Sequence, residues 1–476
     1  MRAGAFWSLC AGLSLGLIGW PGAWGWAGWV WPWFWSKGFR EPQPLGLGAF
    51  GLGLVSSQSL WLVPLLLQSH PFAVGPLALA LGLRLLSWWL LLGLLWVWSR
   101  RTSRWSPQSL FFLCFPFLYL LQAWSGEFFP PMAWPVPSPV AQEPWLGLYG
   151  PGLPLWGTLG IEVCLVWAAL LLGQRWGHKT LPLALLALGL PWFTGGLVLR
   201  PLPAGPVLKV AYLPRSGLLG VNPEEGPALE DVKTRTAKAL ALGVDLVVWP
   251  ESALPDWGQS DLEILASLLG PGQGLLVGAD RKQEGQSVQQ GIFGLLGEEQ
   301  FEFSLATTEA QVSQKGTLRR AGPLFPVHSF GLAPGLGFEP YGDGWYRQRE
   351  AQAEGYVHLF SASGLSPLAK ELLAGLGQAK GRQSFKPVLL VANGTLSGPL
   401  DTSLKGQDPG TWVPPMIGGV VELWGVEPVS PYYSFGWALL LPLGLTVTLL
   451  GLWRNKKPSL SKISATFVQS TPGSSP

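Results

Sequence analysis

Charge is scarce in this 476-residue sequence. Asp, Glu, Lys and Arg make up 12% of it, where an ordinary soluble domain has about 25%. Acidic residues are rarest outside 201–430: that segment holds 24 of the 28 Asp and Glu and 17 of the 31 Lys and Arg, a net −7, and the remainder carries +10. The imbalance, with a mean hydropathy of +0.30, predicts a membrane part joined to an aqueous one. Nucleic-acid binding is excluded because the aqueous part lacks basic charge.

Cysteine is also rare. The three, Cys10, Cys114 and Cys164, lie in apolar runs, and none falls in 201–430. That segment therefore has neither a disulfide nor a thiolate metal site. His328 and His358 are too isolated to indicate a metal site, and no cofactor is expected.

Long apolar runs are abundant instead, and a membrane-spanning helix needs about 20 apolar residues. Residues 1–200 are predicted to form a bundle of seven spans, and 434–453 an eighth. The seven runs lie at about 5–20, 23–36, 45–67, 75–98, 107–124, 153–173 and 180–199.

Basic clusters orient these spans. With seven spans and then an eighth, all four clusters fall on one side, which the positive-inside rule makes cytoplasmic. They are "KGFR" at 37–40, "RRTSR" at 100–104, "RWGHK" at 175–179 and "RNKK" at 454–457. Both termini are therefore predicted to be cytoplasmic, with 201–433 on the outer side of the membrane and a disordered tail at 454–476.

Two ionisable residues, Arg84 and Glu162, fall within predicted spans. They either snorkel or face the bundle interior, or they pair with each other, since intramembrane charges usually find a partner or mark a site.

Residues 201–433 alternate strand and helix patterns, which indicates an α/β domain. The strands are expected at 207–213, 245–249, 274–279, 356–363 and 386–394, and the helices at 226–242, 261–269 and 366–377. The glycine-rich and aromatic stretch 330–347 is interpreted either as a mobile lid or as an ordinary long surface loop.

Three polar residues end predicted strands, where ligands bind in α/β sheets. They are Glu251 in "VVWPES", Ser361 in "SASGLSP" and Asn393 in "ANG". Each has a structural alternative. Glu251 could cap a helix with Ser252, Ser361 could be a small residue in a turn, and Asn-Gly is a strong turn dipeptide.

With these motifs the chain resembles the apolipoprotein N-acyltransferases, integral membrane members of the nitrilase superfamily. The family has eight spans and an extracytoplasmic nitrilase-like α/β sandwich between the last two. By resemblance Glu251 would be the general base, with Trp249 and Pro250 beside it. Lys315 in "VSQKGTL" would stabilise charge, and Ser361 stands at the position of the nucleophilic cysteine.

The resemblance implies a two-step acyl transfer. A phospholipid acyl chain would move to the nucleophile and then to the α-amino group of a diacylglyceryl-cysteine at a lipoprotein N-terminus. The membrane, the phospholipid donor and the diacylated apolipoprotein acceptor would be the partners. The protein would be a multi-pass, monomeric protein of a bacterial cytoplasmic membrane, without a metal or other cofactor.

The sequence departs from the family pattern at several positions. Serine replaces the cysteine, and its hydroxyl is far less acidic than a thiol with a pKa of about 8.5. Two family glutamates align with Pro323 and Ser363. About 35 residues separate Gly398 from the last span, which predicts a sandwich shortened at its C-terminal side.

Three functions therefore compete. The first is a divergent N-acyltransferase acting through Glu251, Lys315 and Ser361. The second is a catalytically inactive relative that binds lipids or lipoproteins or acts as a scaffold. The third is an amidase of nitrilase type with a soluble substrate, which the eight predicted spans disfavour.

Overall fold

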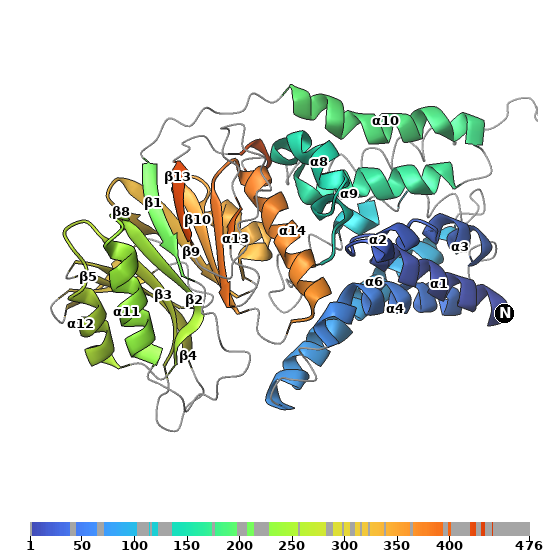
Figure 1. Cartoon of the computed structure of the whole chain (residues 1–476). Helices are drawn as coiled ribbons and strands as arrows, with labels where there is room; N and C mark the ends of the chain where they lie inside the picture. The colour runs from blue at the N-terminus through green and yellow to red at the C-terminus, as the bar shows by residue number, and fades with distance from the viewer. Residues whose placement is uncertain are drawn as a thin grey trace, which may run out of the picture.

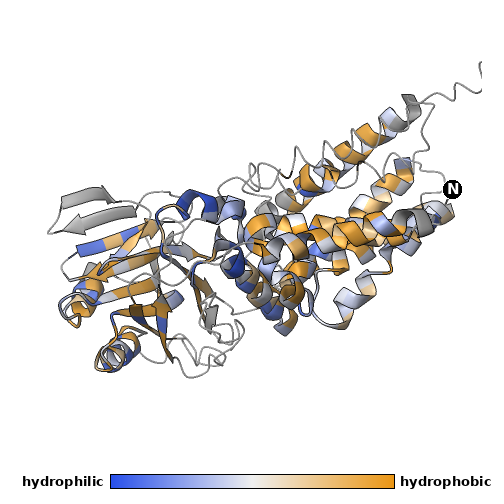
Figure 2. Cartoon of the chain, turned by 90° about the horizontal axis from the view of Figure 1, so that it is seen from above, coloured by the Kyte–Doolittle hydropathy of each residue, from blue (hydrophilic) through white to orange (hydrophobic). Residues whose placement is uncertain are grey.

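In the computed structural model, a helical region built from the first 200 residues adjoins an α/β region (Figure 1). Hydrophobic residues predominate along the ribbon of the helical region, whereas hydrophilic and hydrophobic residues are mixed along that of the α/β region (Figure 2). The structure describes residues 2–38, 44–63, 71–101, 114, 117–121, 136–173, 177–197, 207–213, 228–255, 258–281, 289–297, 299–304, 310–314, 317–321, 324–337, 339–361, 365–393, 398–400, 419–424, 430–433 and 440.

The helical region follows the apolar runs of the sequence. Its helices are α1 (Arg2–Leu17), α2 (Ala23–Gly28), α3 (Trp31–Gly38), α4 (Pro44–Ser59), η1 (Leu60–Leu62), α6 (Pro71–Arg101), η3 (Pro139–Ala141), α8 (Trp145–Tyr149), η4 (Gly150–Gly152), α9 (Leu153–Leu172) and α10 (Gly177–Gly196).

Among the described residues, three segments are long and apolar enough to cross a membrane, fewer than the eight spans expected. They are Pro44–Leu62, Leu81–Trp98 and Trp145–Leu172, with shorter apolar helices at Ala3–Leu17 and Leu181–Gly196. The expected spans 107–124 and 434–453 lie mostly outside the described residues.

The prediction of a single span at 23–36 is wrong. Two short helices, α2 and α3, occupy it, because Gly28 ends the first and Pro32 suits the first turn of the second. They nevertheless run back along α1: a Cβ added at Gly38 would lie 2.7 Å from the Ser8 backbone nitrogen, and one at Gly28 would lie 2.6 Å from that of Ile18. The two short helices therefore lie antiparallel to α1.

Helices α1 and α4 run side by side in the same direction at very close range. A Cβ added at Gly12 would lie 2.1 Å from the Phe50 carbonyl oxygen, and one at Gly16 would lie 1.9 Å from Ser57 Oγ. Small residues four apart allow helices to approach closely where apolar burial gives no drive to associate. This contact forms the centre of the N-terminal bundle.

Both predicted intramembrane charges, Arg84 and Glu162, are buried in the bundle interior. Arg84 Nη2 donates to Gln58 Oε1 at 3.2 Å, and Glu162 Oε1 accepts a hydrogen bond from the Tyr119 hydroxyl. Both side chains thus face the bundle interior and do not snorkel. They also interact electrostatically with each other, so the pairing alternative stays a prediction.

The α/β region contains two sheets packed face to face, so the predicted α/β sandwich is confirmed. The eight-stranded sheet has the order β13-β1-β2-β3-β4-β5-β6-β7. Its strands are β1 (Val207–Tyr212), β2 (Leu246–Pro255), β3 (Gly274–Arg281), β4 (Gln289–Leu296), β5 (Glu299–Ser304), β6 (Ala310–Gln314), β7 (Thr317–Ala321) and β13 (Gly419–Trp424). The five-stranded sheet has the order β12-β11-β10-β9-β8. Its strands are β8 (Phe325–Val327), β9 (Phe330–Leu336), β10 (Gly355–Ser361), β11 (Val388–Asn393) and β12 (Gly398–Leu400).

Each sheet is covered by its own helices. Helices α11 (Ala228–Leu240) and α12 (Gln259–Ala266) cover the outer face of the larger sheet. Helices η5 (Glu339–Tyr341), α13 (Asp343–Arg349) and α14 (Pro367–Ser384) cover the smaller sheet and lie between it and the helical region (Figure 1).

Alternation along the strands builds three apolar layers. On β10, Val357 and Leu359 pack between the sheets, whereas Tyr356 and Phe360 pack under α13 and α14. On β2, Val248 faces the other sheet and Trp249 faces α11.

Both interpretations of 330–347 are wrong. Residues 330–336 form strand β9, and 343–349 form helix α13, in which Trp345 and Tyr346 are buried. The stretch is an inner part of the fold because its aromatic side chains fill the layer between the smaller sheet and the helical region.

Strands also form after Gly398. Strand β13 pairs with β1 in antiparallel register over six residues, from Val207↔Trp424 to Tyr212↔Gly419. The C-terminal side of the sandwich is thus closed by β12 and β13.

Candidate functional site

Glu251 stands in an irregular part of β2. The parallel pairing with β3 runs to Trp249↔Val277 and resumes at Leu254↔Ala279, so β2 has extra residues between these points. Pro250 has no N–H to donate to the ladder, and Ser252 has a φ of 54°. A bulge of this kind re-aims a side chain near a functional site, which explains why the acid is presented here.

The Glu251 carboxylate lies beside the start of the loop after β9. Gly337, at a φ of 58°, would bring an added Cβ to 4.0 Å from Glu251 Oε2. The Gly337 N–H donates to the Leu359 carbonyl at 2.9 Å. Leu359 is two residues before Ser361, the last residue of β10. Glu251 therefore lies near the carboxyl-terminal end of β10.

Ser361 and Asn393 are register partners at the last pair of the parallel strands β10 and β11. The two strands lie against β2. The fold thus brings Glu251, Ser361 and Asn393 to one end of the sandwich, as the strand-end argument predicted. Their backbones are described; the side chains of Ser361 and Asn393 lie outside the described residues.

Lys315 lies outside the described residues. Its flanking strands, β6 and β7, form a hairpin that closes at Gln314↔Thr317. In the order of the larger sheet β6 is four places from β2, which corresponds to about 19 Å at the usual strand spacing. The part of Lys315 in the site remains a prediction.

Trp249 supports β2 from the outer side. It is fully buried, its Nε1 donates to Thr236 Oγ1 at 2.9 Å, and the Arg235 guanidinium lies 4.9 Å from the centre of its ring. Both partners belong to α11. Trp249 therefore fixes the strand that carries Glu251 against its helix layer.

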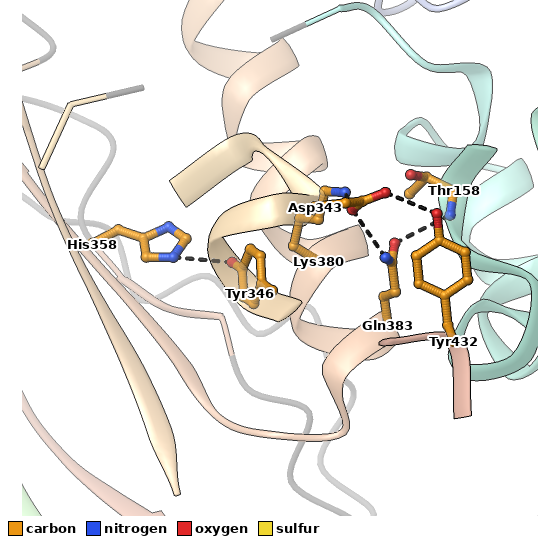
Figure 3. Close-up of polar contacts among 7 residues, drawn as sticks. All are labelled: Thr158, Asp343, Tyr346, His358, Lys380, Gln383 and Tyr432. Atoms are coloured by element: carbon orange, nitrogen blue, oxygen red, sulfur yellow. Dashed lines mark hydrogen bonds and ion pairs between the residues drawn. The ribbon is translucent and has the colours of Figure 1, made fainter. Parts of the chain in front are cut away.

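A buried polar cluster on α13 and α14 was missed by the sequence reasoning (Figure 3). Asp343 forms an ion pair with Lys380 and accepts hydrogen bonds from Gln383 Nε2 at 3.1 Å and the Tyr432 hydroxyl at 2.8 Å. Burial acts to raise the pKa of Asp343, but Lys380 and the hydrogen bonds outweigh it and leave the pKa below its usual value. Asp343 is thus held ionised inside the protein.

Residues of the same cluster contact α9 at a point where this helix is broken. Gly157 has φ 64° and ψ 174°, which interrupts the helix, and the Tyr432 ring lies where its Cβ would be. The Thr158 N–H donates to Gln383 Oε1 at 3.1 Å, and the Pro154 carbonyl accepts from Ser430 Oγ at 3.1 Å. The α/β region therefore satisfies backbone groups that the break frees, as buried helix ends require.

His358, on the helix-covered face of β10, is fully buried. Its Nε2 lies 3.0 Å from the Tyr346 hydroxyl, and burial lowers the pKa of His358 to about 3. The imidazole is therefore neutral at physiological pH. Within the described part of the chain, no cluster of three or more potential metal ligands occurs.

The sequence contains only a weak signal for the polar cluster around Asp343. Lys380 and Gln383 are three residues apart, so they share one helix face, and Asp343 sits alone in an aromatic stretch. Nothing in the sequence links them to Gly157, which is more than 180 residues away from either segment.

The α/β region is therefore a double-sheet sandwich with a helix layer on each outer face. Part of the chain is similar to solved structures, among them one from the nitrilase superfamily. An amidase of that superfamily from Nesterenkonia AN1, solved as a cysteine-to-alanine variant, is 11% identical, with 50% of this chain and 96% of that chain aligned at a TM-score of 0.29. Another amidase structure, from Nesterenkonia sp., is 13% identical over 52% of this chain and 98% of its own, also at 0.29.

A glutamine-dependent NAD+ synthetase from Acinetobacter baumannii is 11% identical, with a TM-score of 0.29. The alignment covers 46% of this chain and only 45% of the synthetase. No family model and no curated protein matches the sequence.

Proposed function

We propose that the chain is a membrane-tethered acyltransferase of the apolipoprotein N-acyltransferase type, with its chemistry at the end of the sandwich that carries Glu251. The observation that supports this most is the position of the Glu251 carboxylate beside Gly337, which is hydrogen-bonded to the end of β10. A base is thereby brought next to the strand end that carries Ser361, at the site where α/β sheets bind ligands.

In the proposed first step, the Ser361 hydroxyl oxygen attacks the ester carbonyl of a phospholipid while Glu251 takes the hydroxyl proton. The bond between the acyl carbon and the glycerol oxygen breaks, and the proton passes from Glu251 to that oxygen. A lysophospholipid is released, and the acyl chain remains on Ser361 as an ester. The amine of a diacylglyceryl-cysteine then attacks the ester, the amide forms, and Ser361 regains its proton. Lys315 is proposed to stabilise the oxyanion of both steps.

Product formation tests the proposal directly. The protein in nanodiscs is incubated with phospholipid and a synthetic diacylglyceryl-cysteine peptide, and mass spectrometry follows N-acylation. Native protein should form product, and Ser361→Ala and Glu251→Gln should each lower the rate at least 100-fold. Lys315→Ala should lower it by a similar factor.

Matched controls lie on α12, which covers the outer face of the larger sheet, and just after its end. Glu263→Gln removes an exposed acid, and Ser267→Ala removes an exposed hydroxyl. Neither should change the rate. Absence of product from the native protein and from Ser361→Cys would contradict the proposal. It would favour a catalytically inactive lipid-binding relative, which the serine at the cysteine position also fits.

A further inference from the structure

A pocket with both apolar and charged residues in its lining lies on the other side of the smaller sheet from Glu251. It has a volume of about 810 Å³ and is lined by Gly22, Gln142, Glu143, Lys370, Glu371 and Gln378, among others. Lys370, Glu371 and Gln378 share one face of α14, whereas Leu372 and Leu373 are buried within the apolar core. Helix α14 and the smaller sheet therefore separate this pocket from the candidate catalytic site.

The pocket lies where the apolar helices of the membrane region end. Its wall includes Gly22, after α1, and Leu146 on α8, just before α9 begins. α14 closes it from the side of the α/β region, where a Cβ added at Gly375 would lie 2.2 Å from the Ala141 carbonyl oxygen.

Aromatic rings gather beside it. The Trp145 ring centre is 6.0 Å from that of Trp26 and 5.5 Å from that of Trp29. Trp24 and Trp26 are 59% and 56% exposed. Tryptophans of this kind collect at the level of the lipid headgroups. Trp145 directly precedes Leu146 of the pocket lining, so these rings favour a position of the pocket near the lipid headgroups.

The charges of the lining are mixed. Lys370 supplies one cation, and Glu143 and Glu371 supply two carboxylates. The Gln142 Nε2 is buried and has no hydrogen-bond partner among the described residues, so a turn of this amide toward the pocket would give the N–H a partner in an occupant. Glu143 Oε2 accepts from the Gly147 N–H at 3.2 Å, which holds this carboxylate in place.

We infer that this pocket binds the headgroup of a zwitterionic phospholipid that carries a phosphate and a primary ammonium. The phosphate pairs with Lys370 and the Gln142 amide, and the ammonium donates to Glu143 and Glu371. Charge-assisted hydrogen bonds of this type need N–H donors on the ligand, so a trimethylated ammonium is bound more weakly and an uncharged glycerol headgroup more weakly still. The inference does not depend on catalysis at Glu251.

Native mass spectrometry of the full chain in detergent tests the site. Lipids with identical acyl chains and phosphoethanolamine, phosphocholine or phosphoglycerol headgroups are added, and the retained lipid is counted. Phosphoethanolamine lipid should be retained at about tenfold lower concentration than either other lipid. Lys370→Gln should weaken its retention about tenfold, as expected for loss of one hydrogen bond to a charged group.

Two further variants separate charge from shape. Glu143→Gln with Glu371→Gln should remove the preference for phosphoethanolamine over phosphocholine, and Gln378→Trp, which fills the pocket, should abolish specific retention of both. The matched control is Glu230→Gln with Lys233→Gln, an exposed pair on α11, which should change nothing. Tryptophan fluorescence during heating shows that each variant is folded.

Equal retention of the three lipids, or equal loss in the α11 control, would overturn the inference. So would retention of soluble phosphoethanolamine without retention of the lipid. Because the readout is binding, failure of the acyltransferase assay leaves this result unaffected.

Discussion

Each of the two helix layers of the sandwich covers the outer face of one sheet, but the ion pairs in the two layers differ in burial. On α11, ion pairs such as Glu230–Lys233, at 3.4 Å, join side chains that are 61% and 41% exposed. Between α13 and α14, the Asp343–Lys380 pair joins side chains that are 14% and 6% exposed. One layer faces water and the other faces apolar helices (Figure 1). An ion pair is thus buried where its helix packs against the helical region, and exposed where its helix faces solvent.

The largest effect is expected from breaking the buried pair. Asp343→Ala leaves Lys380 buried without its carboxylate and removes the acceptor of Tyr432 and Gln383, so we expect a loss of about 3–5 kcal/mol in the free energy of unfolding. The measurement is denaturant unfolding in detergent, followed by tryptophan fluorescence.

Its control is Asp231→Ala on α11, whose exposed pair with Arg235 should contribute no more than about 1 kcal/mol. Similar losses for the two variants would show that the layers do not differ in this way.

The break in α9 should be nearly as sensitive. Gly157→Ala places a side chain in a backbone conformation that only glycine adopts readily, at a cost of about 1–3 kcal/mol, and pushes the new Cβ into the Tyr432 ring. The unfolding temperature should fall.

Gly189→Ala in α10 is the matched control, since open space surrounds that position. It should leave stability unchanged or raise it by up to about 1 kcal/mol. If Gly157→Ala behaved the same way, the break would not be needed for the joint between the two regions.

On the water-facing layer, the buried hydrogen bond matters more than the ion pairs. Thr236→Val removes the acceptor of Trp249 Nε1 and leaves that N–H buried, so we expect a loss of about 1–3 kcal/mol. Thr234→Val, at an exposed position two residues earlier on α11, leaves the hydrogen bond to Trp249 in place and serves as the comparison in the same unfolding assay. Equal effects would show that the loss comes from the helix and not from the bond to Trp249.

A further effect depends on pH and is absent at neutral pH. His358 has a folded pKa of about 3, below its unfolded value of about 6.5, so the unfolded chain binds the extra proton between these values. The stabilisation from neutral His358 is complete above pH 6.5 and is lost at up to about 1.4 kcal/mol per pH unit as the pH falls towards 3.

His358→Gln should flatten this part of the stability profile between pH 6.5 and 4.5. His328→Gln, at a half-exposed histidine, should not. A slope that persists in His358→Gln would assign the acid sensitivity to other groups.

The positions of three strands were predictable from local patterns. Buried apolar runs predicted β2, β10 and β11, so Glu251, Ser361 and Asn393 were expected at one end of the sheets, where their backbones lie. The expected end of the first of these strands at 249 was wrong, because β2 continues past Glu251 to Pro255. The hairpins of β4 to β7 were missed because their polar, weakly patterned residues pair over an edge region where burial imposes little alternation.

The helical side was harder to predict from sequence. Uninterrupted hydrophobicity made 23–36 look like one span, although Gly28 and Pro32 mark an end and a start. Stretch 330–347 looked like a loop because glycines and prolines interrupt its pattern, yet its aromatic rings are buried by α14. Such burial depends on partners far away in the chain, which no local window contains.

The pairing of Val207 with Trp424 decides where the chain enters and leaves the larger sheet. These residues are the first of β1 and the last of β13, and paired Cα atoms of antiparallel strands lie only about 5 Å apart. The two ends of the stretch 207–424 therefore meet at almost one point. A linker of a few residues would close the gap left by removing this stretch, so a truncated chain that keeps the helical segments is a practical variant to make.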